Sequence, residues 1–189
     1  MISLIVMILD IVLVFFIILT IFRFFRVVIM RTKLIKNIKK ICQKNNYKLE
    51  ICRFPFISVF YKSPKIDLIV NTTQNIYYIK LVSSFSSKKV FHFVDSTNYI
   101  TYLKMFFALP MASSVSEDIR FISYHQFPKI IKKEPVSEND KYIILFNPIP
   151  NEITYIAKDG SKQIAGNGAM LEEFYIYNGK GFCSLLDRL

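Results

Sequence analysis

The first forty residues, "MISLIVMILDIVLVFFIILTIFRFFRVVIMRTKLIKNIKK" (1–40), decide the architecture of this chain. From Ile2 to Phe22 nearly every residue is apolar. The polar exceptions are Ser3, Asp10 and Thr20. Because a helix rises about 1.5 Å per residue, this run is long enough to cross a hydrocarbon core of about 30 Å. We therefore predict a transmembrane anchor over residues 1–30.

Asp10 is the charged residue inside this apolar run. An aspartate near the centre of a span costs about 2.5–3.5 kcal/mol, whereas each Leu, Ile, Val or Phe favours insertion by about 0.3–0.6 kcal/mol. The many apolar residues outweigh the single acid, so we expect insertion. At this depth the carboxyl group is either protonated or paired with a polar group on another membrane helix, and the sequence leaves both alternatives open.

The residues that flank the apolar run predict its orientation. A cleaved signal peptide would begin with a basic region and end at small residues, but here no charge precedes the run and Phe-Arg-Phe-Phe-Arg follows it. We therefore interpret the segment as an uncleaved signal anchor. Lys and Arg are retained on the cytoplasmic side of membranes. The sequence thus predicts a single-pass protein with its N-terminus outside and its C-terminal domain in the cytoplasm.

Residues 31–48 have the pattern of a basic amphipathic helix. Apolar residues recur from Leu34 to Cys42 at three- and four-residue spacing, with lysines between them, so we expect the membrane helix to continue to about Lys44. We expect this apolar stripe to pack on the domain's own core rather than on lipid. The basic residues suit anionic lipid headgroups. The candidate membrane- or partner-binding residues are Asp10, Arg23, Arg26, Arg31, Lys33, Lys36, Lys39 and Lys40.

The net charge of +11 would ordinarily suggest a nucleic-acid partner. However, residues 1–48 contain nine of the 25 Lys and Arg residues and one of the 14 acids. The excess of positive charge is thus concentrated where the chain leaves the membrane. Nucleic-acid binding by the domain stays possible, but we favour anionic lipid, together with another membrane protein or a second copy of this chain, as the partners.

Residues 49–189 read as one cytoplasmic α+β domain of mainly antiparallel strands with one or two helices. Strands are predicted over 56–62, 66–71, 75–82, 89–94, 119–124 and 142–148, the last of them buried. Residues 95–110 suit either a helix or a strand, and we favour a helix that ends before Pro110. Asp159-Gly160 and Asn178-Gly179 each lie between alternating runs, which predicts two hairpins.

Residues typical of catalytic or metal sites are few. His92 and His125 lie in aromatic, strand-like contexts, and Cys42, Cys52 and Cys183 form no Cys-x-x-Cys pair. Phosphate-binding and hydrolase motifs do not occur in the sequence. We therefore predict structural histidines, reduced thiols, and no catalytic residue, cofactor site or metal site.

One arrangement resembles a known enzyme family. A helix followed by a meander, with Asp67 on the second strand and Lys80 on the third, is similar to the core of the restriction-endonuclease-like nucleases. That family has an Asp followed on the next strand by Asp/Glu-x-Lys, and the two acids hold a divalent metal. Here Tyr78 occupies the position of the second acid. The resemblance covers about residues 33–82 and implies a version of the fold without the catalytic set.

These observations favour a non-enzymatic function. We expect a membrane-anchored cytoplasmic domain that acts as a protein-interaction or assembly component. The alternative is a tethered, degenerate restriction-endonuclease-like or nucleic-acid-binding domain.

Overall fold

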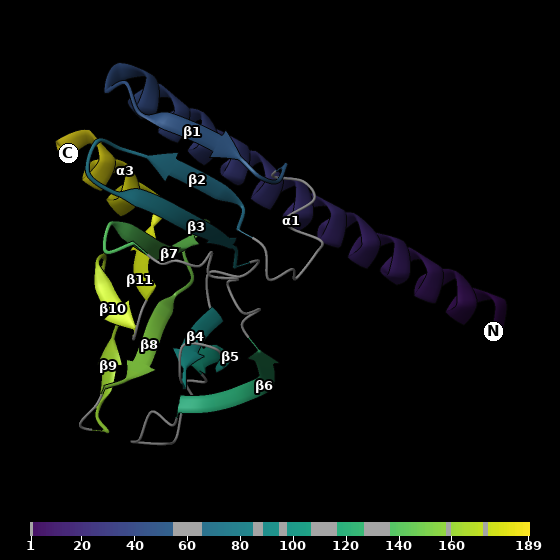
Figure 1. Cartoon of the computed structure of the whole chain (residues 1–189). Helices are drawn as coiled ribbons and strands as arrows, with labels where there is room; N and C mark the ends of the chain where they lie inside the picture. Colours follow the sequence, from purple (N-terminus) through teal and green to yellow (C-terminus); the bar gives the residue numbers. More distant parts are fainter. Residues whose placement is uncertain are drawn as a thin grey trace.

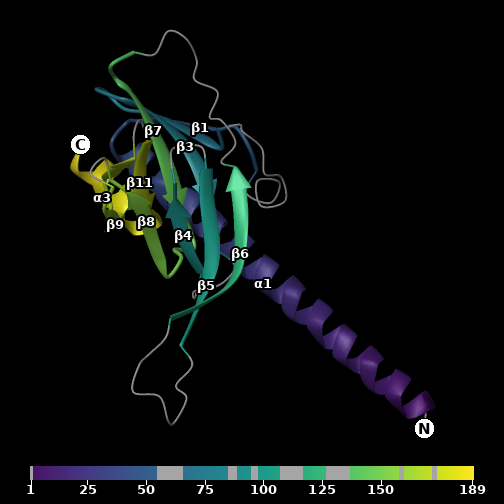
Figure 2. The same ribbon diagram turned by 90° about the horizontal axis from the view of Figure 1, so that it is seen from below.

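The computed structural model describes residues 2–54, 66–84, 89–94, 98–106, 117–126, 137–157, 160–171 and 174–189 (Figure 1). Within these residues the chain forms two helices and two sheets of mostly antiparallel strands, so the predicted α+β class is confirmed. The helices are α1 (Ile2–Lys44) and α3 (Gly179–Arg188). Helix α1 is continuous, as the sequence predicts, and its N-terminal half extends away from the domain in both views (Figures 1 and 2).

The first sheet has the strand order β1-β2-β3-β7-β11-β10. Its antiparallel half is the meander β1-β2-β3, and β7 then pairs parallel to both β3 and β11. This places β7 in the middle of the sheet, which explains why its residues 142–146 are apolar or aromatic and buried. The strands are β1 (Lys48–Ile51), β2 (Leu68–Asn71), β3 (Ile76–Val82), β7 (Asp140–Phe146), β10 (Ala169–Leu171) and β11 (Phe174–Asn178).

The second sheet has the order β6-β5-β4-β8-β9. Its β4–β8 pair is parallel and its other pairs are antiparallel. The chain enters this sheet after β3 and leaves it for the first sheet at β7, then crosses once more through β8 and β9 before β10. The strands are β4 (Lys89–Phe93), β5 (Asn98–Phe106), β6 (Glu117–Gln126), β8 (Glu152–Ile156) and β9 (Lys162–Ile164).

Two apolar cores lie on opposite faces of the first sheet. One core joins α1 and α3 to the sheet, and Ile38 of α1 and Phe182 of α3 are fully buried in it. The other core joins the first sheet to the second through aromatic contacts such as Phe91–Phe146. The domain is therefore built in three layers: helices, first sheet, second sheet.

Most predicted strands are confirmed, including the predictions for 66–71, 75–82, 89–94, 119–124 and 142–148. The strand predicted over 56–62 lies outside the described residues. The hairpin expected around Asp159-Gly160 is confirmed, since β8 and β9 pair antiparallel and Gly160 has a positive φ of 81°. Asp159 itself is not among the described residues.

Two predictions are wrong. The segment predicted as a helix over 95–110 contains β5, which pairs with strands on both sides, and its β-branched and aromatic residues suit that position. The hairpin expected at Asn178-Gly179 is a helix start. The Asn178 side chain accepts a hydrogen bond from the Gly181 amide at 2.8 Å and caps α3, while the strand before it pairs with β7 instead of with a following strand.

Candidate functional site: the membrane-proximal half of α1 and its junction with the domain

The N-terminal half of α1 exposes its large apolar side chains. Residues such as Leu9, Phe16 and Phe22 are 61, 61 and 69% exposed. The helix is long and apolar enough to cross a membrane, and its most apolar window is not buried by any other part of the domain. A single candidate span near the N-terminus is thus confirmed for the part of the chain that the structure describes.

Asp10 lies on the exposed surface of this apolar half. Among the described residues nothing donates a hydrogen bond to its carboxylate or forms an ion pair with it. If the segment spans a membrane, the carboxyl group therefore faces either lipid or a group from another helix. Both alternatives that the sequence left open for Asp10 stay open.

The bases that follow the apolar half divide into an exposed set and one buried residue. Arg31 is only 3% exposed and turns away from the helix surface that carries the others. It faces the first sheet and not the solvent or a headgroup layer. The exposed bases are Arg23, Arg26, Lys33, Lys36, Lys39 and Lys40.

Arg31 fastens α1 to the end of β3. Its Nε donates to Ser83 Oγ at 2.6 Å and its Nη2 donates to the Leu81 carbonyl oxygen at 3.2 Å. One residue earlier, the Met30 carbonyl accepts from Asn147 Nδ2 at 2.9 Å, just after β7. The ends of two neighbouring parallel strands are therefore bonded to one turn of the helix.

A buried ion pair lies beside this junction. Lys80 Nζ is 3.0 Å from Asp67 Oδ2, and the two side chains are 6 and 0% exposed. The same carboxylate oxygen accepts from the Leu81 amide at 2.8 Å. Backbone amides of Cys52 and Arg53 donate to the Asp67 carbonyl oxygen. Asp67 thus connects β3, the chain after β1, and the start of β2.

Asp67 interacts electrostatically with basic side chains. Arg31 and Lys80 both feel the Asp67 carboxylate, and Arg53 and Arg31 in turn repel Lys80. Burial lowers the pKa of the Lys80 ammonium below its usual value, while the Asp67 carboxylate opposes that change. The Asp67 carboxylate helps to make these buried cations tolerable, because an unpaired buried charge is costly. Its other oxygen, Oδ1, is buried without a hydrogen-bond partner among the described residues.

Of the three residues on which the nuclease-like resemblance depends, Asp67 and Lys80 lie in contact. The third, Tyr78, makes an aromatic contact instead. Asp67 and Lys80 meet, although lone acids and lysines on strands usually face solvent. Tyr78 stacks on Tyr142 with ring centroids 5.2 Å apart, so an aromatic contact occupies the position of the family's second acid. Among the described residues no group of three His, Cys, Asp or Glu side chains is placed to hold a metal ion.

The histidines and cysteines, which we predicted to be structural and reduced, differ in their surroundings. His92 Nδ1 lies 2.8 Å from Thr154 Oγ1, a contact between β4 and β8. Burial, aided by Lys162, lowers the pKa of His92. The side chain of His125 lies outside those described. Cys42 is buried, Cys183 is half-buried and Cys52 is exposed.

Sequence reasoning did not find the junction formed by Arg31, Ser83 and Asn147. In the sequence, Arg31 resembles the exposed bases near it, and only the face of the helix on which it lies distinguishes it from them. That face was visible: Arg31 lies three and four residues before Leu34 and Ile35, both buried. Arg31 therefore belongs to the same stripe as the apolar residues that were expected to pack on the core.

No protein-family model, no curated protein and no solved structure matches this chain.

Proposed function

We propose that this chain is a single-pass membrane protein whose β-rich domain lies in the cytoplasm and acts there as a non-enzymatic interaction or assembly component. The observation that carries the proposal is the continuity of α1, which runs from Ile2 to Lys44 without a break. The same helix supplies the exposed apolar segment and a side of the domain core. Such a domain has no flexible linker to its anchor.

A helix that is both anchor and core element fixes how the domain is presented. Val27 is 2% exposed, so packing on the domain begins within a few residues of the exposed Phe22 and Phe25. The hydrogen bonds of Arg31 and Asn147 then resist rotation of the sheet about the helix. A fixed height and rotation suit a component that meets partners at the membrane, because little orientational freedom has to be lost on binding.

The buried ionisable side chains at the junction support a non-enzymatic role. Asp67 and Lys80 are almost completely buried and engaged with each other. Arg31 is engaged with Leu81 and Ser83 at the end of β3. These side chains stabilise the junction and are not presented to a substrate. The exposed bases of α1 lie on its surface beyond the apolar half, which supports a cytoplasmic domain close to anionic headgroups.

The proposal predicts that the rotation of the domain about α1 matters for assembly. Two alanines inserted after Phe24 would turn the domain by about 200° and move it by about 3 Å, whereas four would turn it by only about 40° and move it by about 6 Å. In native membranes, chemical cross-linking of the wild-type chain should give a discrete complex. The two-alanine variant should lose that complex and the four-alanine variant should keep most of it.

Both variants must insert and fold equally for this comparison, which carbonate extraction and protease resistance of the domain would establish. Equal cross-linking of wild type and both variants would contradict the proposal, because the orientation of the domain would then be irrelevant. Absence of any discrete complex of the wild-type chain would contradict it too.

A second candidate is a tethered, degenerate nuclease-like or nucleic-acid-binding domain. The meeting of Asp67 and Lys80 on neighbouring strands favours it. Salt-sensitive binding of single-stranded nucleic acid by the full chain in detergent, without a membrane-protein complex, would favour this candidate over the first.

A further inference from the structure

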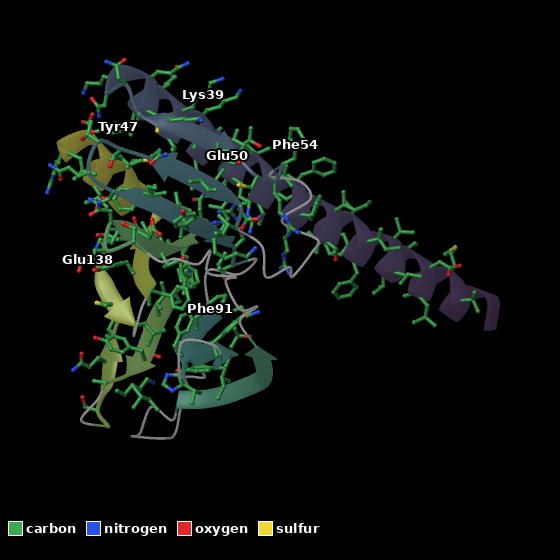
Figure 3. All side chains as sticks on the ribbon, in the orientation of Figure 1. Lys39, Tyr47, Glu50, Phe54, Phe91 and Glu138 are labelled. Atoms are coloured by element: carbon green, nitrogen blue, oxygen red, sulfur yellow. The ribbon has the colours of Figure 1, made fainter. Side chains whose placement is uncertain are left out.

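A set of exposed lysines lies on the side of α1 that is turned away from the first sheet. Its members are Lys33, Lys36, Lys39 and Lys40. Residues such as Leu34 and Ile38, which lie between them in the sequence, are buried against the sheet. With 3.6 residues per turn, the four lysines occupy an arc of about 120° around the helix. Figure 3 shows Lys39 projecting away from β2 and β3. We call these four residues the lysine face.

The lysine face has no acid of its own to balance its charge. The sequence contains no Asp or Glu from residue 11 to residue 49. In the part of the chain that the structure describes, no acid forms an ion pair with any of the four lysines, whereas Lys44 at the end of the helix pairs with Asp187. Like charges three or four residues apart on a helix repel one another. A ligand of opposite charge would remove this repulsion.

Anionic headgroups do not account for the lysine face. The apolar run ends at Phe22 and α1 continues without a break. Lys36 and Lys40 therefore lie about 21 and 27 Å beyond the end of the run, and a tilt of about 20° shortens these distances by only about 1–2 Å. The headgroup layer is about 5–7 Å thick, and its charge is screened over about 8 Å at physiological salt. Arg23 and Arg26 are close enough to meet headgroups, but Lys36 and Lys40 are not.

The arrangement of the lysines favours one class of partner. A second copy of this chain in the same membrane would bring the same lysines to the same height, so the two faces would repel each other. Proteins that bind single-stranded nucleic acid present aromatic side chains on which bases stack, but residues 31–44 contain none. Lysines at three- and four-residue spacing instead match carboxylates at the same spacing on one side of an acidic helix.

We propose that the lysine face binds an acidic helix of another membrane protein, which runs alongside α1 from the membrane into the cytoplasm. The inference rests on the proposed function and names the chemistry of its partner. Phe22 and Ile29 precede Lys36 at intervals of almost two helical turns, so they lie on the same side of α1, and they are 69 and 51% exposed. A helix along this side therefore meets apolar residues first and lysines beyond them. That order suits a partner that leaves the same membrane.

Carbodiimide cross-linking tests this contact directly, because the reagent joins a lysine amine to a carboxylate that lies against it and leaves an amide bond. The affinity-tagged full chain is treated in native membranes and purified, and its cross-linked peptides are identified by mass spectrometry. Lys180, an exposed lysine on α3, is the internal control.

Two triple variants at Lys33, Lys36 and Lys40 complete the experiment. Replacement of all three by Glu reverses the charge, whereas replacement by Arg keeps the charge but prevents the amide bond. Carbonate extraction and protease resistance of the domain establish that both variants insert and fold.

Amide bonds should join the lysine face to Asp or Glu residues of one other membrane protein, and Lys180 should form few. The Glu variant should co-purify about tenfold less of that protein, because like charges then face each other across the contact. The Arg variant should retain the protein without amide bonds at the three positions. Replacement of the partner's cross-linked acids by Lys should restore its binding to the Glu variant.

Equal amounts of the same partner on wild type and on the Glu variant would overturn the lysine face as the contact and leave the proposed assembly role intact. Amide bonds to a second copy of this chain would overturn it in favour of self-association. Release of the bound material by nuclease would overturn it in favour of nucleic acid. Absence of any discrete complex of the wild-type chain would contradict the proposed function together with this inference.

Discussion

At the scale of single residues, the domain depends on one buried carboxylate. Asp67 accepts a hydrogen bond from the Leu81 amide and pairs with Lys80, and it faces the charge of Arg31 as well. Both sides of a buried ion pair lose their hydration, so the pair itself contributes little net stability. Removing its negative member, however, takes away the carboxylate that Lys80 and Arg31 face.

This arrangement predicts unequal effects for the two members of the pair. Asp67→Asn should destabilise the domain by about 3–5 kcal/mol, because the buried Lys80 and Arg31 then lose the carboxylate that they face. Lys80→Met should cost less, since Asp67 keeps the Leu81 amide and the charge of Arg31. Denaturant unfolding of the full chain in detergent measures both free energies of unfolding. A double variant that is more stable than Asp67→Asn alone would support the explanation, and equal costs for the two single variants would contradict it.

A second residue on which a prediction depends is Asp10, which lies in the proposed membrane span. If it pairs with a group on another membrane helix, Asp10→Leu should insert at least as well as wild type, since the change favours insertion by about 3 kcal/mol. The variant should nevertheless lose a specific complex that cross-linking detects in native membranes. Asp10→Asn, which still forms hydrogen bonds, should keep part of it. The same cross-linked species from wild type and Asp10→Leu would show that Asp10 is merely tolerated, in its protonated form.

At the scale of secondary-structure elements, local patterns predicted those elements whose environment is uniform along the sequence. Helix α1 to Lys44 and the buried strand β7 were readable because their apolar pattern is long and consistent. The ambiguous segment 95–110 failed because the pairing of β5 with strands on both sides, a tertiary effect, outweighed a weak helix start. Strand β1 was missed since four residues on a sheet edge have too little pattern.

Asn178 shows how one residue type serves two local structures. Asn-Gly is typical of a hairpin turn, but Asn is equally a helix N-cap, and only the residues beyond Gly179 distinguish the two. Here Phe182 and Leu186, four residues apart, are both fully buried against α1 and the first sheet. Their spacing is that of a helix and was the available signal.

The capping role of Asn178 predicts a small, specific loss of stability. Asn178→Ala should lower the free energy of unfolding by about 1 kcal/mol, because the Gly181 amide loses the oxygen that it bonds at 2.8 Å. Asn178→Ser retains an acceptor and should cost clearly less. Denaturant unfolding of both variants in detergent makes the comparison. An equal loss in the two variants would indicate that the amide of Asn178 acts in some other way.

At the scale of the whole molecule, the sequence predicted the anchor, the basic helix and the domain as separate parts of the chain. It did not predict the junction between the helix and the domain. The apolar run, the basic region and the α+β domain were all apparent from composition and spacing. The contacts of Arg31 with the end of β3, and of Met30 with Asn147 after β7, join residues fifty or more positions apart. Local sequence patterns do not predict contacts between residues so far apart in the chain. The result is a domain fixed to its helix, and a helix suited to a membrane.

The central claim, that α1 spans a membrane and the domain lies on its cytoplasmic side, is tested most directly by thiol labelling. Cys52 is exposed, whereas Cys42 is buried and burial raises the pKa of Cys183, which makes that thiol less reactive. A membrane-impermeant maleimide is applied to cells that express the full chain, before and after permeabilisation, with Cys52→Ser as the control. The account predicts Cys52-dependent labelling only after permeabilisation. Labelling of Cys52 in intact cells would contradict it.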